Sequence, residues 1–271
     1  MHELTELQHC QMLYPAVRVR AQKAGGSGTI IYSKPDKTGE FHSFALTNHH
    51  VIEDCVQVKK KWDSKLGREL KKETRATVYT EIFQYKYLSH CIGNTALESD
   101  IMCYDADQDI ALLKLRSIEK MEHVANFIKK DDIPSLKIFD PTFAIGASLG
   151  HPPIATQGMI TYMDDEIDNY KYWMSNAQII YGNSGGSMYV RINDVYYFIG
   201  IPSRVSISGW ADTITHMGYF IPPINIMEFL DKNHYEFIYD SNKTMEDCDA
   251  ERKKEEELAR KAMEKELGVV S

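Results

Sequence analysis

The five residues from Gly182 to Gly186, Gly-Asn-Ser-Gly-Gly, constrain this chain most, because they place a serine in a glycine-rich turn after an apolar strand. A serine hydroxyl is a weak nucleophile until a neighbouring base removes its proton. Flanking glycines allow a backbone tight enough to aim two N–H groups at one point. The turn therefore predicts a histidine base and a buried carboxylate elsewhere. An ordinary hairpin turn is the alternative, since Asn and Gly favour turns for conformational reasons.

Length, charge and cysteine content exclude several protein classes. A chain of 271 residues, 43% of them hydrophobic, can bury the core of a single all-β domain. The net charge of −8 argues against nucleic acid as a partner. The five cysteines are scattered without a Cys-x-x-Cys pair, so we expect reduced thiols, no metal and no cofactor.

The first residues lack the features of a secretory signal. Residues 1–14 contain histidine and glutamate and no continuous apolar run. No later window reaches the roughly 18 apolar residues of a membrane span. The sequence therefore predicts a cytoplasmic protein without a membrane partner.

Most of the chain has the pattern of short strands separated by turns. We expect strands at residues 16–21, 29–32, 41–47, 76–88, 100–104, 110–115, 143–147, 154–163, 171–174 and 218–223, with a hairpin over 188–201. Gly25 to Gly28 are expected to connect the first two strands, and residues 224–230 to form a helix after proline. The pattern predicts an all-β fold.

Two charged segments differ from the rest. Residues 59–75 are rich in lysine, look inserted, and are expected to form a solvated loop or exposed ribbon and not an anion site. Residues 245–267 are dense in Glu, Lys, Arg and Ala. Their narrow apolar stripe predicts a solvated helix or a disordered tail, with a partner-binding helix as the alternative.

Two motifs precede the serine turn, Thr-Asn-His-His-Val ending at Val51 and Asp-Ile-Ala-Leu-Leu beginning at Asp109. Together the three segments resemble those of chymotrypsin-fold serine peptidases, specifically the HtrA/Deg-like branch. Residues 143–146, 156–160 and 220–222 resemble other segments of that branch. Independent short motifs in the right order seldom coincide, so the combination is a strong signal.

The resemblance implies two six-stranded β-barrels over residues 14–231, after an N-terminal segment of residues 1–13 and before a charged tail of residues 232–271. It also implies a serine endopeptidase acting on polypeptides. In that family His50 would be the base, Asp109 would orient it and Ser184 would attack, with the backbone N–H groups of Gly182 and Ser184 as the oxyanion hole. Alternation at the strand end would point His49 to the opposite side.

Specificity is expected from two short segments. The family position at the base of the primary pocket falls on Gln178, whose neutral side chain disfavours a basic substrate residue. The other wall is expected from Gly200, Ile201, Pro202 and Ser203. We therefore expect a small or medium neutral residue before the cleaved bond.

The chain also departs from the family pattern. The spacing from His50 to Asp109 is long, consistent with an insertion at residues 59–75. About 40 residues follow the barrels, too few for the PDZ domain of many HtrA-like peptidases. Such a peptidase would suit a viral or phage processing role. The N-terminal segment or the charged tail is the expected site of contact with a second copy or a protein partner.

Two other functions stay open. A trypsin-like fold with a silent triad could serve as a binding or structural module, for example in a particle. An esterase could also use the Gly-x-Ser-x-Gly pattern around Ser184, but the order His, Asp, Ser and the missing helix–strand alternation disfavour it.

Overall fold

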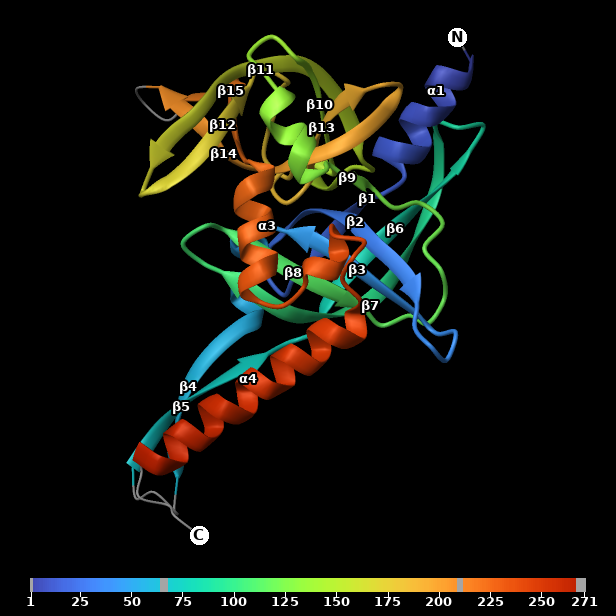
Figure 1. The fold of residues 1–271 in the computed structure, drawn as a ribbon. Helices are drawn as coiled ribbons and strands as arrows, with labels where there is room; N and C mark the ends of the chain where they lie inside the picture. Colours follow the sequence, from blue (N-terminus) through green and yellow to red (C-terminus); the bar gives the residue numbers. More distant parts are fainter. Residues whose placement is uncertain (1, 64–67, 209–211, 267–271) are drawn as a thin grey trace.

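The computed structural model describes residues 2–63, 68–208 and 212–266, and strands form most of it (Figure 1). Six antiparallel strands close the first barrel in the order β1-β2-β3-β8-β7-β6. They are β1 (Ala16–Arg20), β2 (Gly25–Pro35), β3 (Phe41–Thr47), β6 (Val78–Lys86), β7 (His90–Asp105) and β8 (Ile110–Leu115). Alternating apolar residues such as Val17 and Val19 fill its interior, as a half-buried strand pattern requires.

The second barrel has the order β13-β10-β11-β12-β15-β14 and is closed by pairing of β13 with β14. Its strands are β10 (Pro141–Gly146), β11 (Ile154–Ile167), β12 (Tyr170–Ser175), β13 (Ser187–Ile192), β14 (Val195–Ser208) and β15 (Asp212–Ile221). The short strand β9 (Asn126–Phe127) adds in parallel to β14. The predicted fold of two six-stranded barrels is therefore confirmed.

A core shared by both barrels extends beyond residues 14–231. It includes Leu112 of the first barrel and Phe198 of the second, with Phe229 from helix α3 (Pro223–Lys232). Met12 and Cys248 are buried in the same cluster. Met12 lies in a π-helical turn, η1 (His9–Leu13), that continues helix α1 (His2–Gln8).

The glycine-rich run at Gly25 to Gly28 differs from the prediction. These residues lie inside β2 and pair with Arg20 to Val17 of β1, so the connection between the strands is residues 21–24. Small residues are needed there because the β2 backbone approaches the serine turn, where Ser27 N–H donates to the carbonyl of Ser184 at 2.8 Å.

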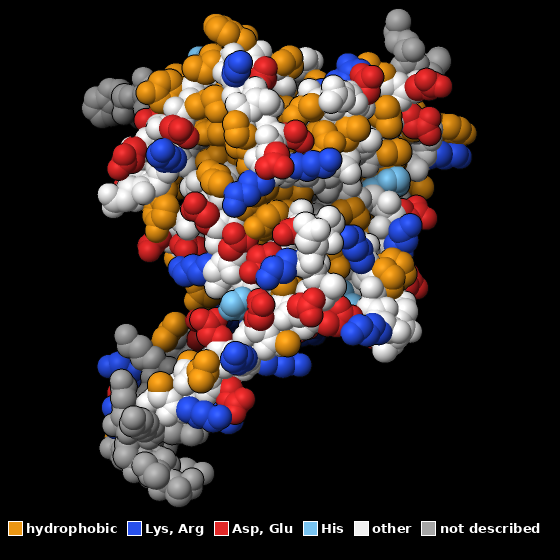
Figure 2. Space-filling model, viewed as in Figure 1, with side chains coloured by type: hydrophobic (Ala, Val, Ile, Leu, Met, Phe, Trp, Pro, Cys, Tyr) orange, Lys and Arg blue, Asp and Glu red, His pale blue; other side chains and the backbone are white. Residues whose placement is uncertain are grey.

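The two charged segments project from the body of the molecule (Figures 1 and 2). Strands β4 (Val56–Asp63) and β5 (Arg68–Arg75) form a separate two-stranded ribbon, one of the two expected arrangements. The tail forms helix α4 (Met245–Glu266), and Leu267, the last residue of the predicted helix, lies outside the described residues. Cys248 is fully buried, whereas most of the following residues are exposed.

No helix in the described ranges is long and apolar enough to cross a membrane. All five cysteines have free thiols. Burial raises the pKa of Cys103 to about 12, which keeps that thiol protonated and unreactive at neutral pH.

Candidate active site

His50 lies on a short helix, α2 (His49–Ile52), that begins directly after β3. This corrects the expectation of a strand end, so strand alternation does not determine where the two histidines point. His50 Nδ1 lies 2.8 Å from Asp109 Oδ2. The ring of His49 stacks on Tyr104 instead, with centroids 4.9 Å apart. The structure thus separates the neighbouring histidines.

Asp109 occupies the turn between β7 and β8 with a φ of 61°, a conformation that residues other than glycine rarely adopt. Its Oδ1 accepts the backbone N–H of His50 at 2.9 Å, and its backbone carbonyl accepts Asn48 Nδ2 at 2.7 Å. Its Oδ2 also accepts the hydroxyl of Ser203 at 2.6 Å. Hydrogen bonds from two segments, residues 48–50 and Ser203 of β14, therefore hold both the carboxylate and the unusual backbone in place.

The ionisation of Asp109 results from opposing effects. Burial of the carboxyl raises its pKa, but the hydrogen bonds and charge of His50 and the hydroxyl of Ser203 outweigh burial and bring the pKa below its ordinary value. Only 13% of the Asp109 side chain is exposed, against 44% for His50. An ionised, largely buried carboxylate thus faces an imidazole that is open to solvent.

The turn that carries Ser184 packs directly on the residues before His50. Gly185 has a φ of 83°, and a Cβ built on it would lie 2.3 Å from Thr47 Oγ1 and 3.0 Å from the backbone nitrogen of Asn48. Only glycine fits such an approach. The three segments predicted from sequence therefore lie together at the junction of the two barrels.

The peptide unit between Tyr181 and Gly182 has a fixed orientation. The carbonyl of Tyr181 accepts the N–H of Leu149 at 3.0 Å. Because the N–H and C=O of a trans peptide point in opposite directions, the N–H of Gly182 points away from Leu149. No described residue accepts a hydrogen bond from the N–H of Gly182 or of Ser184. Neither N–H is therefore engaged within the described part of the protein.

Two buried polar residues that the sequence did not single out support this turn. Ser27 Oγ donates to the carbonyl of Gly182 at 2.6 Å and accepts the N–H of Ala147 at 2.7 Å. Asn183 Oδ1 accepts the hydroxyl of Ser148 at 2.5 Å. The only sequence signal for Ser27 is its place in a Gly-Gly-Ser-Gly run, and the signal for Asn183 is its place in the serine turn.

The residues expected to form the substrate pocket occupy different environments. Gly200 and Ile201 are fully enclosed in β14, where they pair with Met188 and Ile221 and belong to the packed interior. The carbonyl of the buried Pro202 accepts Gly185 N–H at 3.1 Å. Ser203 contacts Asp109, as described above. Gln178 is exposed, and its carbonyl accepts Thr156 Oγ1 at 2.8 Å.

Strand β14 has an open edge beside Asp109. Its pairing with β13 ends at Gly200, and in the described residues the part beyond Pro202 pairs with β15 alone. This edge begins at Ser203, whose hydroxyl reaches Asp109. An extended peptide could add to such an edge by main-chain hydrogen bonds.

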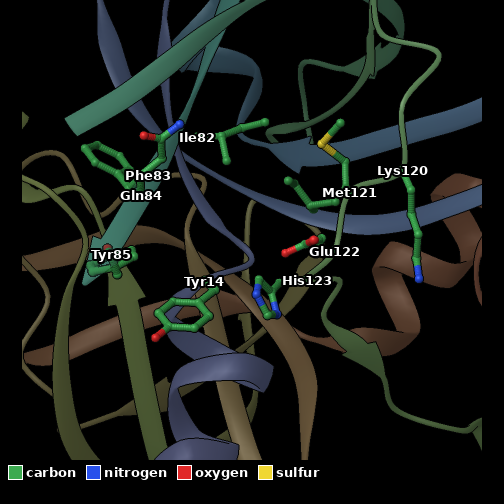
Figure 3. A pocket seen from close by; sticks show the side chains of 10 residues that line it. Tyr14, Ile82, Phe83, Gln84, Tyr85, Lys120, Met121, Glu122 and His123 are labelled. Atoms are coloured by element: carbon green, nitrogen blue, oxygen red, sulfur yellow. The ribbon is translucent and has the colours of Figure 1, made fainter. Parts of the chain in front are cut away.

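A separate cavity of about 380 Å³ lies between β6, Tyr14, Ile30 of β2 and residues 120–123 (Figure 3). Tyr14 stacks on Tyr85 with centroids 5.0 Å apart, and His123 lies against the same ring of Tyr14. The described lining contains neither His50 nor Asp109 nor Ser184. This cavity is therefore distinct from the candidate active site.

One group of possible metal ligands occurs among the described residues, formed by His234, Glu236 and Glu251 within 4.8 Å of one another. His234 Nε2 lies 2.7 Å from Glu255, and Lys243 lies 3.8 Å from Glu251. His234 thus links the turn after α3 to Glu251 and Glu255 of α4.

The sequence matches one known family, described as the trypsin-like peptidase domain, over residues 26–195. No protein of curated function matches it.

Two solved structures share the fold. An HtrA-type protease with a tripeptide superposes with a TM-score of 0.58 at 17% identity, covering 86% of this chain and 64% of that chain. A serine endoprotease from Yersinia pestis superposes with a TM-score of 0.56 at 20% identity, covering 84% of this chain and 65% of that chain. This chain therefore spans less than two thirds of the length of either protease.

Proposed function

The chain belongs to the trypsin-like peptidase family, and we propose on that premise that it is a serine endopeptidase acting through His50, Asp109 and Ser184. The observation that carries the proposal is that the Asp109 carboxylate hydrogen-bonds to both the ring and the backbone N–H of His50. The packing of the Ser184 turn against Thr47 and Asn48 supports it, because Asn48 directly precedes the helix that carries His50.

In the proposed reaction, the N–H at His50 Nδ1 donates a hydrogen bond to Asp109 and keeps its proton. The other ring nitrogen, Nε2, is then unprotonated and acts as the base. Nε2 takes the proton of the Ser184 hydroxyl as its oxygen attacks the scissile carbonyl carbon. The tetrahedral intermediate collapses to an acyl-enzyme as His50 protonates the leaving amine. Water, deprotonated by His50, then attacks the acyl carbon, the bond to Ser184 Oγ breaks, and His50 returns the proton to that oxygen as the acid product leaves.

The negative oxygen of the tetrahedral intermediate needs hydrogen-bond donors. The unengaged N–H groups of Gly182 and Ser184 supply them in this proposal, and losing one such donor typically lowers the rate on the order of 10² to 10³. Because the donors are backbone groups, their aim depends on the conformation of the turn and not on a side chain.

We propose a polypeptide substrate that lies in extended form along the open edge of β14, starting at Ser203. Pro202 supplies no N–H to this edge, so main-chain donors begin beyond it. We also propose a preference for a small or medium neutral residue before the cleaved bond, because the neutral side chain of Gln178 offers no counter-charge to a basic one.

A fluorophosphonate probe tests the proposal, because it reacts with an activated serine independently of substrate preference. We expect labelling of Ser184, located by peptide mass spectrometry, that disappears in Ser184→Ala and in His50→Ala. His49→Ala is the matched control, since that ring stacks on Tyr104 and should leave labelling intact. A folded wild-type protein that does not label would overturn the proposal and favour a binding module with the same fold.

A further inference from the structure

Arg18 connects the two barrels beside the candidate oxyanion hole. It lies on β1 of the first barrel, and its Nη1 donates to the carbonyl of Gly150 in the second. Its Nε donates to Glu81 Oε2, which Nη2 also contacts. A single guanidinium thus holds a carboxylate of one barrel and a main-chain carbonyl of the other.

Glu81 determines the direction of this guanidinium. The Glu81 side chain is only 7% exposed, and a buried carboxylate requires charged or hydrogen-bonding partners. Arg20 also pairs with Glu81, at 3.2 Å to Oε1, but its own side chain is 55% exposed. Arg18 alone of these two arginines reaches the second barrel in the described structure.

Gly150 ends the short 3-10 turn η4 (Ser148–Gly150), which packs against the peptide unit of Gly182. A Cβ on Gly182 would lie 2.6 Å from the backbone nitrogen of Leu149 and 2.9 Å from the carbonyl of Ala147. Leu149, with a φ of 51°, donates the hydrogen bond to Tyr181 that orients the N–H of Gly182.

These contacts form a continuous relay, and we propose that Arg18 is a positioning residue for the oxyanion hole. By holding the carbonyl of Gly150, Arg18 fixes the Leu149 N–H, which in turn fixes the peptide unit of Gly182. The inference rests on the proposed function only in assigning the Gly182 N–H to a reacting oxyanion. The relay itself is a property of the fold.

The alternative is that Arg18 only neutralises Glu81. Arg20 provides the matched comparison, because it contacts the same carboxylate without touching η4. Arg18→Ala removes both contacts of Arg18. Arg18→Lys keeps a charge beside Glu81 and preserves folding, but a single ammonium cannot span both acceptors.

The experiment measures kcat and KM with a fluorogenic peptide amide that has a small neutral residue before the cleaved bond. It also measures amide hydrogen exchange over residues 147–151 and 181–184. We expect Arg18→Ala and Arg18→Lys to lower kcat about tenfold to a hundredfold with little change in KM, since small misplacement of a catalytic group has costs of this size. The Leu149 amide should exchange at least about tenfold faster in both. Arg20→Ala should stay within about twofold of wild type.

Equal effects of the Arg18 and Arg20 variants, or unchanged exchange at Leu149 in Arg18→Lys, would overturn the inference while leaving the proposed function intact. An increase in KM at constant kcat would also overturn it, because loss of substrate binding differs from loss of transition-state stabilisation. If the wild-type protein neither cleaves peptides nor labels with fluorophosphonate, the proposed function fails, and the exchange rate at Leu149 alone decides the inference.

Discussion

Ser203 and His50 share one oxygen of Asp109, since Ser203 Oγ lies 2.6 Å and His50 Nδ1 2.8 Å from the same Oδ2. The hydroxyl comes from the second barrel and the imidazole from the first. The carboxylate that orients the proposed base is therefore itself oriented by the strand along which we propose that substrate binds.

Removing that hydroxyl should weaken catalysis. Ser203→Ala leaves Asp109 Oδ2 with one donor fewer, and hydrogen bonds to charged groups contribute about 1.5–3 kcal/mol. We expect kcat/KM to fall about tenfold or more. Ser206→Ala is the control on the same strand, because its hydroxyl donates to the carbonyl of Met217 at 3.1 Å. Equal losses in the two variants would argue against the role given to Ser203.

Asp109 should make the stability of the fold depend on pH. Its pKa in the folded protein lies below the ordinary carboxyl value of about 4, so its contribution is present above that value. The contribution disappears as pH falls through the folded-state pKa. Urea unfolding of the wild type and Asp109→Asn should therefore show a stability difference at pH 6 that shrinks below about pH 4. A difference that grows on acidification would contradict the hydrogen-bonding account of Asp109.

Gly182→Ala should abolish activity through conformation. Its φ is 96°, and the added Cβ would lie 2.6 Å from the backbone nitrogen of Leu149. Gly39 has a φ of 90° with no neighbour within 4 Å of an added Cβ. Gly39→Ala should thus cost only the backbone strain, about 1–2 kcal/mol, and keep full activity. Thermal unfolding of both variants measures the cost of backbone strain. Peptide hydrolysis shows whether η4 has been displaced, because only that displacement should remove activity.

The tail should divide into a structural and a dispensable part. Cys248 is fully buried, and the guanidinium of Arg252 lies 4.1 Å from the ring centroid of Tyr235. Removing residues 245–271 should therefore destabilise the fold by about 2–4 kcal/mol. Removing only residues 257–271 should change stability by less than about 0.5 kcal/mol, because the described part of this stretch is exposed. Chemical denaturation measures both, and equal losses would contradict this division.

Local motifs explain what the sequence predicted well. The segments around His50, Asp109 and Ser184 each carry their signal within a few adjacent residues, and period-two patterns marked most strands. Helix α2 was missed because a four-residue helix has no periodicity to detect.

Long-range contacts explain what the sequence could not predict. Ser27 is 155 residues from Gly182 in sequence, Arg18 is 132 from Gly150, and Ser203 is 94 from Asp109. Their roles arise only when the two barrels dock, so no local pattern around these residues could indicate them. The burial of Gly200 and Ile201 also depends on a long-range contact, because the pairing of β14 with β13 encloses both residues.

The β4–β5 ribbon can differ in length or composition without altering the barrel from which it projects. Val56 pairs with Arg75, and Ala76 N–H donates to the carbonyl of Cys55 at 2.8 Å, so the chain leaves and re-enters the barrel at one point. The distance in space between His50 and Asp109 is thereby uncoupled from their distance in sequence. The ribbon is a natural insertion point, where a segment can be lengthened, shortened or exchanged for a reporter while the geometry of the proposed catalytic residues stays the same.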